Sequence, residues 1–526
     1  TSLLANKRVV YTELADLLIS QGRLTEAEQI LRLLKEQEYV DFVRRDQRAT
    51  GLAGEATSNA FEAPWAARYQ EISDHLAALG REYGELSRLP RAARGASQQA
   101  RYQTLQADLA VARQAYQAHL QDLRSAFAAL GPERAMAFAE HDLDSLRALQ
   151  GTLRQLGPGT VLLHYLVTPE RLRILVTTAD VQLHRDSPIS EAELNRLILA
   201  YRQVLQDPRR DPRAPARALY DVLIAPVHND LQHAEARVLM LGLDANLRYL
   251  PLAALHSGER WLAEDYALSL YTAAARANLT TPPRGDWHIA GLGVSEAAQG
   301  FSALPAVPFE LHSVVRDPLR NPDGGMLQGS IRLNDEFDAE ALTEILEDAY
   351  PVVHIASHFH FGHGTEADSF LVLGNDQRLS LEDFRHGAFP LHDVDLLTLS
   401  ACETAVGGPG DNGREVEGFG VMAQRQGARA VIATLWPVAD ASTGLFMQQF
   451  YDQRVHAQAH KAEALRRAQL ALLGDQMDLS TVPESLTRGL ARPAPANVPE
   501  PYIPDPNRPF SHPYYWAPFV LMGNWL

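Results

Sequence analysis

Residues Leu396 to Thr404 read Leu-Leu-Thr-Leu-Ser-Ala-Cys-Glu-Thr and contain Cys402, the only cysteine in 526 residues. The apolar and β-branched run at the start predicts a buried strand that ends just before the cysteine. A lone cysteine can form neither an internal disulfide nor a Cys-rich zinc site. Cys402 is therefore either a free thiol packed as a small apolar side chain or a nucleophile.

A second short strand is predicted upstream, where residues 351–358 read Pro-Val-Val-His-Ile-Ala-Ser-His. It ends in His358, which lies 44 positions before Cys402. A thiol becomes a thiolate near neutral pH when a base or an imidazolium cation lies beside it. In an open parallel α/β sheet, reactive groups gather at the carboxyl ends of the strands. If the two strands are adjacent and parallel, imidazole and thiol meet at one edge of the sheet.

Four blocks of sequence resemble the signature blocks of CHAT domains, which are bacterial relatives of caspases and separases. The blocks are His354-Ile-Ala-Ser-His358, Leu399-Ser-Ala-Cys402-Glu-Thr404, Gly427 to Pro437, and His512 to Phe519. The resemblance covers roughly residues 150–526. It implies a caspase-like α/β fold, with a parallel sheet sandwiched by helices, and a catalytic dyad of His358 and Cys402.

The resemblance also implies roles for neighbouring residues. The backbone N–H groups of Phe359 and Cys402 would form the oxyanion hole. The family often has glycine directly after the catalytic histidine, so Phe359 is a departure that bears on the local turn geometry. Ser400, Trp436 and Asp440 match positions that line the substrate pocket, although Asp440 could equally be a helix N-cap.

The composition excludes several classes of protein. The net charge is −17 and the sequence pI is about 5.6, whereas nucleic-acid binders are normally basic. We therefore expect no direct contact with nucleic acid. No apolar run approaches the roughly 20 residues of a membrane span, and no signal peptide is evident. Together with the near absence of cysteine, this favours a cytoplasmic protein with no membrane contact. Because Thr1 falls inside a helical pattern, we expect the chain to be a fragment of a longer protein.

Changes in periodicity divide the chain into four expected regions. Two apolar helical stripes meet at Gly22 and resemble one tetratricopeptide (TPR) unit, although an ordinary helical hairpin fits equally well. A second, longer pair of stripes predicts two antiparallel helices. The first two regions are a TPR-like end of a longer helical array (1–50) and a long antiparallel helical hairpin (51–150). Alternating strands and helices follow, and the resemblance to CHAT domains implies that they form an inactive caspase-like half (151–285) and an active caspase-like protease half (286–526).

Histidines cluster around the second strand, which raises a metal site as a rival interpretation. His354, His358, His360 and His363 lie within ten residues, and His386 or His392 could complete a ligand set. No Asp, Glu or Cys follows at a zinc-like spacing, so we expect no metal and no cofactor. We expect His354 to be a buried structural histidine, and His360 and His363 to be loop residues near the site.

The function that follows is a cysteine endopeptidase acting on a protein substrate through Cys402 and His358. A regulatory protein partner would bind the N-terminal helices, and the resemblance implies a bacterial defence setting. The glycine-rich segment Gly407–Glu415 would be a substrate-binding or activation loop. Two alternatives remain: an inactive scaffold of the same fold, and a metal-dependent hydrolase built on the histidine cluster.

Overall fold

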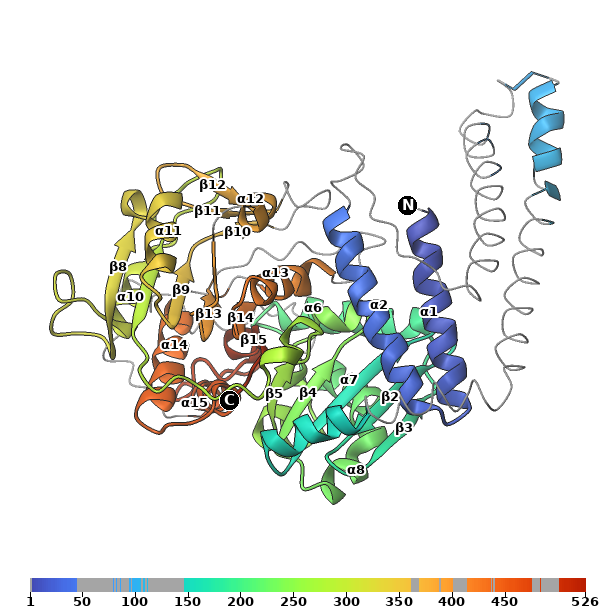
Figure 1. Cartoon of the computed structure of the whole chain (residues 1–526), viewed down its shortest axis with the longest axis horizontal. Helices are drawn as coiled ribbons and strands as arrows, with labels where there is room; N and C mark the ends of the chain where they lie inside the picture. The colour runs from blue at the N-terminus through green and yellow to red at the C-terminus, as the bar shows by residue number, and fades with distance from the viewer. Residues whose placement is uncertain are drawn as a thin grey trace.

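The computed structural model describes residues 2–44, 146–360, 369–386, 389–400, 414–436, 440–474 and 501–526, with a few more positions at 79–111, 438 and 483. These residues form one large, mostly parallel sheet flanked by helices, with a small second sheet beside it (Figure 1). The α/β class predicted from the sequence is confirmed.

The large sheet has twelve strands in the order β3-β2-β1-β4-β5-β15-β14-β13-β9-β6-β8-β7, and the small sheet has the order β10-β11-β12. In the large sheet only β1 with β2, β2 with β3, and β14 with β15 are antiparallel. The strands of the first half are β1 (Thr160–Val167), β2 (Leu172–Thr177), β3 (Gln182–Ser187), β4 (Val238–Gly242) and β5 (Ala267–Leu270). Those that follow are β6 (Ile289–Gly293), β7 (Val315–Arg316), β8 (Leu327–Leu333), β9 (Val352–Ala356), β10 (Phe359–His360), β11 (Phe370–Val372), β12 (Arg378–Ser380), β13 (Leu396–Leu399), β14 (Ala430–Thr434) and β15 (Phe519–Gly523).

The helices connect these strands and cover both faces of the large sheet. The N-terminal pair is α1 (Ser2–Ser20) and α2 (Leu24–Arg44). The first half continues with α6 (Glu191–Leu205), α7 (Arg213–Leu223), η3 (Ala225–Val227), α8 (His228–His233), η4 (Ala245–Tyr249), η5 (Leu252–Ala254), α9 (Leu262–Asp265) and η6 (Ala274–Asn278). The second half contains α10 (Val307–Val314), η7 (Asn334–Glu336), α11 (Ala339–Glu347), α12 (Leu381–His386), α13 (Arg414–Arg425), α14 (Asp440–Val455), α15 (Lys461–Leu473) and α17 (Pro513–Trp516).

Alternation of side chains along β9 identifies the two helical layers of the second half. On one face, His354 forms hydrogen bonds with Glu310 of α10 and Tyr451 of α14. On the other face, Val353 and Ile355 line an apolar pocket together with side chains from α11 and α12. Strands buried on both faces explain why the sequence of β9 is almost continuously apolar.

The N-terminal helical hairpin packs directly on the first half of the sheet. Leu166 of β1 shares an apolar cluster with Ala15 of α1 and Leu31 of α2. On the opposite face, the Tyr165 hydroxyl donates to the carbonyl of Leu223 in α7 at 3.1 Å. Helices α1 and α2 therefore form one layer of the first half, with α6 and α7 forming the other.

A buried ionic cluster fastens this hairpin to the sheet. The carboxylate of Glu38 in α2 pairs with Arg8 of α1 and with Arg248 of η4. Glu38 and Arg248 are both fully buried or nearly so. The turn between α1 and α2 is made by Gly22, whose φ of +74° is left-handed. The predicted hairpin is thus present, while its assignment to the TPR class stays a prediction.

Several expected features fall outside the described residues. They include most of the helical hairpin expected for 51–150. The segment Gly407–Glu415 also falls outside them up to residue 413, and Arg414 begins α13 two residues earlier than expected. Within the described part of the chain, no helix has both the length and the apolar composition of a membrane span.

Candidate active site

The strands that lead to His358 and Cys402 are adjacent and parallel. Each residue of β9 pairs with the residue of β13 that lies 44 positions later in the sequence. There are four successive pairs, from Val352 with Leu396 to Ile355 with Leu399. The Ser400 N–H continues the ladder by donating to the carbonyl of Ile355 at 2.8 Å. The same interval of 44 separates His358 from Cys402 in the sequence. Cys402 lies outside the described residues, so its pairing with His358 stays a prediction.

The imidazole of His358 is held from one side by the loop between β6 and α10. Its Nε2 lies 2.8 Å from the carbonyl oxygen of Ser302. A carbonyl oxygen only accepts hydrogen bonds, so this contact requires the proton on Nε2 and leaves the lone pair on Nδ1 in the neutral ring. The ring of Phe301 stacks on the imidazole, with centroids 4.8 Å apart and planes at 22°. Nδ1 is therefore the nitrogen available to act as a base.

Phe301 and Ser302 were not identified from the sequence. They lie more than fifty positions before His358. The preceding Gly300 predicts a turn, but it does not indicate that this turn contacts His358. The contact depends on how the β6–α10 loop crosses the sheet edge. That path is set by tertiary structure rather than by a motif.

Phe359 occupies an extended strand with a buried side chain. Val372 donates its N–H to the carbonyl of His358 at 2.9 Å, and Phe359 lies opposite Leu371 in β11. Because hydrogen-bonded and non-hydrogen-bonded pairs alternate in an antiparallel ladder, the N–H of Phe359 is directed away from β11. Phe359 is not one of the described residues with positive φ, so its backbone conformation does not require glycine.

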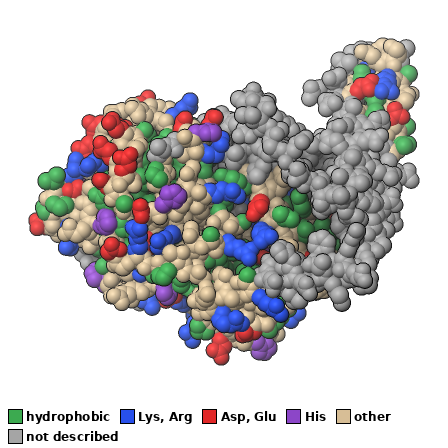
Figure 2. All heavy atoms as spheres, viewed as in Figure 1, with side chains coloured by type: hydrophobic (Ala, Val, Ile, Leu, Met, Phe, Trp, Pro, Cys, Tyr) green, Lys and Arg blue, Asp and Glu red, His purple; other side chains and the backbone are tan. Residues whose placement is uncertain are grey.

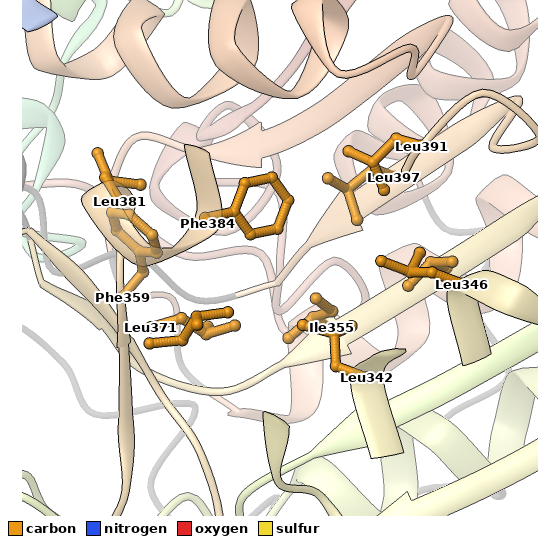
Figure 3. A pocket seen from close by; sticks show the side chains of 11 residues that line it. Leu342, Leu346, Ile355, Phe359, Leu371, Leu381, Phe384, Leu391 and Leu397 are labelled. Carbon is orange, nitrogen blue, oxygen red and sulfur yellow. The ribbon is translucent and has the colours of Figure 1, made fainter. Parts of the chain in front are cut away.

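The side chain of Phe359 anchors this strand. Its ring is 1% exposed and lines an apolar pocket with side chains from β9, β11, β12, β13, α11 and α12 (Figure 3). Figure 3 shows the ring lying between Leu381 and Leu371. The substitution of phenylalanine for the glycine often found in the family is thereby compatible with an ordered backbone at this position.

The three residues expected to line the substrate pocket lie in different surroundings. Ser400 follows β13 and is 6% exposed, and its hydroxyl has no hydrogen-bond partner among the described residues. Trp436 follows β14 and is 2% exposed, with its indole N–H donating to the Tyr514 carbonyl at 3.1 Å. Asp440 is the first residue of α14, and its side chain is outside the described residues. The substrate-pocket role of all three stays a prediction.

A buried polar network ties β9 to β13 below the site. His354 is 0% exposed; its Nε2 lies 2.9 Å from Glu310 and its Nδ1 lies 3.1 Å from the hydroxyl of Tyr451. That hydroxyl also lies 3.1 Å from Thr398 in β13, which is the register partner of His354. Burial raises the pKa of the Tyr451 phenol above its usual range, so the group stays protonated. The predicted structural role of His354 is confirmed.

The histidine cluster is divided among separate environments. His360 was expected in a loop but lies in the two-residue strand β10, with its ring centroid 5.2 Å from that of Phe370. His354 is committed to the buried network, and His363 lies outside the described residues. Within the parts of the chain that are described, no three His, Cys, Asp or Glu side chains are grouped so that they could hold a metal ion.

Similarities of this chain to curated proteins and to individual solved structures are absent or weak. A search of curated proteins found no match. Among solved structures, the separase of Saccharomyces cerevisiae in complex with securin matches at 9% identity and a TM-score of 0.43, over 73% of this chain and 31% of that chain. Gingipain R of Porphyromonas gingivalis, an Arg-specific cysteine proteinase, matches at 8% identity and a TM-score of 0.32, over 58% of this chain and 68% of that chain.

The chain therefore spans less than half of the separase chains that it matches. Similarities this low assign neither a residue role nor a substrate. The family comparison is stronger, because the CHAT domain matches residues 213–524, which is more than half of the chain. This chain belongs to the CHAT-domain family.

Proposed function

We propose that this chain is a cysteine endopeptidase in which Cys402 is the nucleophile and His358 is its base. The observation that carries the proposal is the register of β9 and β13, because their 44-residue offset is also the interval between the two residues. The chain can run at most about 7 Å over the two residues that follow Ser400. Both groups then belong to the carboxyl edge of the sheet, where α/β folds place reactive groups.

The environment of His358 supports a defined sequence of proton transfers. Nδ1 takes the proton of the Cys402 thiol, and the thiolate attacks the carbonyl carbon of a peptide bond. The backbone N–H groups of Phe359 and Cys402 stabilise the oxyanion of the tetrahedral intermediate. The leaving amine takes the proton from His358 as the C–N bond breaks and a thioester remains. Water then hydrolyses the thioester and restores the thiol.

The surface beside the site favours a peptide over a nucleic acid as substrate. Figure 2 shows acidic side chains gathered over the region of β8 and α11. The exposed carboxylates of α11 are Glu340, Glu344 and Glu347. Such a surface repels the phosphates of nucleic acid, which bind to basic patches.

The rate at which iodoacetamide alkylates Cys402 tests the dyad, because the chain has no other cysteine. An unperturbed thiol is only a few per cent ionised at pH 7, so we expect His358→Ala to slow alkylation by about tenfold. His360→Ala, two residues further along the chain, is the matched control and should alkylate at the wild-type rate. Equal rates in wild type and His358→Ala would refute the dyad and favour the scaffold alternative.

We also propose that a partner protein, by family resemblance a bacterial defence effector, regulates the site through the N-terminal helices. The support is a contact between α2 and α13, where the Arg425 guanidinium lies 4.1 Å from the centroid of the Tyr39 ring. Helix α13 begins at Arg414, twelve positions after Cys402. Tyr39→Ala should therefore change the alkylation rate of Cys402, whereas Leu33→Ala on the exposed side of α2 should not. Unchanged rates in both would refute this route.

A further inference from the structure

Three turns with left-handed backbone meet beside His358. In the described chain, eight non-glycine residues have positive φ. Four of them fall in these turns: Gln299 at +53°, Asn334 at +52°, Asn375 at +55° and Asp376 at +56°. Non-glycine residues in this conformation are strained and persist only where the surroundings fix them, often at functional sites. At Asn375 and Asp376 the two-residue hairpin turn itself requires positive φ, whereas Gln299 needs contacts that hold it in this conformation.

The tip of the β11–β12 hairpin holds the β6–α10 loop. The carboxylate of Asp376 accepts a hydrogen bond from the N–H of Gln299 at 2.7 Å. The side-chain amide of Gln299 donates in return to the carbonyl of Asp376. Asn334 holds the start of the same loop, since its side-chain oxygen accepts from the N–H of Ser295 at 2.8 Å. The loop is therefore fixed at both ends of its first turn.

The held loop carries both groups that contact His358. Phe301 and Ser302 follow Gln299 by two and three positions. The N–H of Phe301 donates to the carbonyl of Ala298, which closes the turn around Gln299. Phe301 then stacks on the imidazole, and the Ser302 carbonyl accepts from Nε2. A shift of Gln299 would move both contacts together.

We propose that Asp376 is a positioning residue for His358: it fixes the Gln299 turn, which in turn sets the tautomer and orientation of the imidazole. The inference rests on the proposed dyad and extends it to a residue outside the family blocks. Asp376 is exposed at the tip of a hairpin, so its contacts contribute little to the core. Its effect should appear in the chemistry of the site and not in the stability of the fold.

The test measures the alkylation rate of Cys402 by iodoacetamide between pH 5.5 and 10, together with the melting midpoint. Asp376→Gly is the informative variant, because glycine adopts a positive φ without strain but lacks the carboxylate. Asp376→Asn keeps an acceptor oxygen and tolerates the left-handed backbone, so it is the conservative variant. Asp323→Gly, in the exposed loop between β7 and β8, is the matched control.

We expect Asp376→Gly to slow alkylation at pH 7 by about fivefold, the ratio that corresponds to one ordinary hydrogen bond. The rate should be unchanged at pH 10, where the thiol is ionised without help, and the melting midpoint should not move. Asp376→Asn and Asp323→Gly should follow the wild-type pH profile. A purely structural role would instead lower the midpoint and leave the profile unchanged.

Two results would overturn the inference, and they are distinguishable. If His358→Ala alters the pH profile while Asp376→Gly follows the wild type, the dyad stands and Asp376 has no positioning role. If His358→Ala itself follows the wild type, the dyad fails and the role of Asp376 fails with it.

Discussion

Replacing Phe359 with alanine should destabilise the second half of the protein. It should also distinguish the packing role of the Phe359 ring from the proposed oxyanion role of its backbone N–H. The ring is 1% exposed and is one of eleven side chains that line the apolar pocket of Figure 3. The existing free volume there is about 10 Å³, roughly the space of a single water, so the neighbours are already close-packed. Removing a buried phenylalanine ring costs about 3–5 kcal/mol, since the lost transfer energy adds to the cost of a cavity.

The expected loss can be measured as a melting midpoint. One kcal/mol corresponds to about 2–4 °C for a domain of 150–250 residues, so the midpoint should fall by roughly 6–20 °C. Leu379→Ala removes another side chain that lines the same pocket, from β12, and should cost about 2–5 kcal/mol. It is the matched control because Leu379 has no part in the proposed oxyanion hole.

Catalysis should respond differently in the two variants below their melting midpoints. In Phe359→Ala the peptide N–H loses its anchor, and loss of one oxyanion donor costs up to about 10²–10³ in rate. Peptide cleavage should therefore fall strongly, while alkylation of Cys402, which forms no oxyanion, should stay near the wild-type rate. Leu379→Ala should retain cleavage. A Phe359→Ala protein with a wild-type midpoint and wild-type cleavage would refute both the packing argument and the oxyanion role.

Three further predictions concern stability. Burial lowers the pKa of His512 to about 4 from its ordinary value of 6.5, so between these pH values the unfolded state binds more protons than the folded state. The free energy of unfolding should therefore fall by about 3 kcal/mol as the pH falls from 6.5 to 4. His512→Asn should flatten this pH dependence in urea titrations, and the same dependence in both proteins would contradict the prediction. Lys461 and Asp395 are both 0% exposed and lie 3.3 Å apart, and Asp395 also has Arg429 at 3.7 Å and the indole N–H of Trp287 at 2.9 Å. Lys461→Met removes the buried cation closest to this carboxylate and should cost up to about 3–5 kcal/mol; a neutral effect on the denaturation midpoint would refute this. Truncation from Tyr514 onward removes β15, which lies between β5 and β14, and should abolish folding; a truncated protein that melts cooperatively would show this to be wrong.

The strands next to the site could be predicted because their apolar sequences indicate that they are buried. β9, β13, β14 and β15 are short apolar runs, as expected for strands covered on both faces. The turn at Asn375 was also predictable, since Gly-Asn-Asp between two apolar runs is a hairpin signal.

Other strands could not be predicted, for physical reasons. β3 reads Gln-Leu-His-Arg-Asp-Ser and is a polar edge strand, so it lacks the apolar pattern of a buried one. β10 has only two residues, and its pairing with β11 depends on contacts far along the chain. Strands of this kind form because a neighbouring strand offers hydrogen bonds, and a single sequence does not show that neighbour.

The residues of the candidate site also include some that the sequence identifies and others that only the tertiary structure shows. His358 could be identified because it ends an apolar strand and belongs to a recognisable block. Ser302, Phe301 and Asp376 could not, because each acts through a loop whose path depends on the sheet edge. Phe359 was identified from the motif, but its role as an anchor became evident only from the packing of its ring.

The central claim is that the chain cleaves peptide bonds with Cys402 and His358. A peptide library incubated with the purified protein and analysed by mass spectrometry tests it most directly, with Cys402→Ala, His358→Ala and a chelator as parallel arms. We expect cleavage products from the wild type, none from Cys402→Ala, a loss of at least about 10²-fold in His358→Ala, and no effect of the chelator. Cleavage that survives Cys402→Ala, or that the chelator abolishes, would contradict the account.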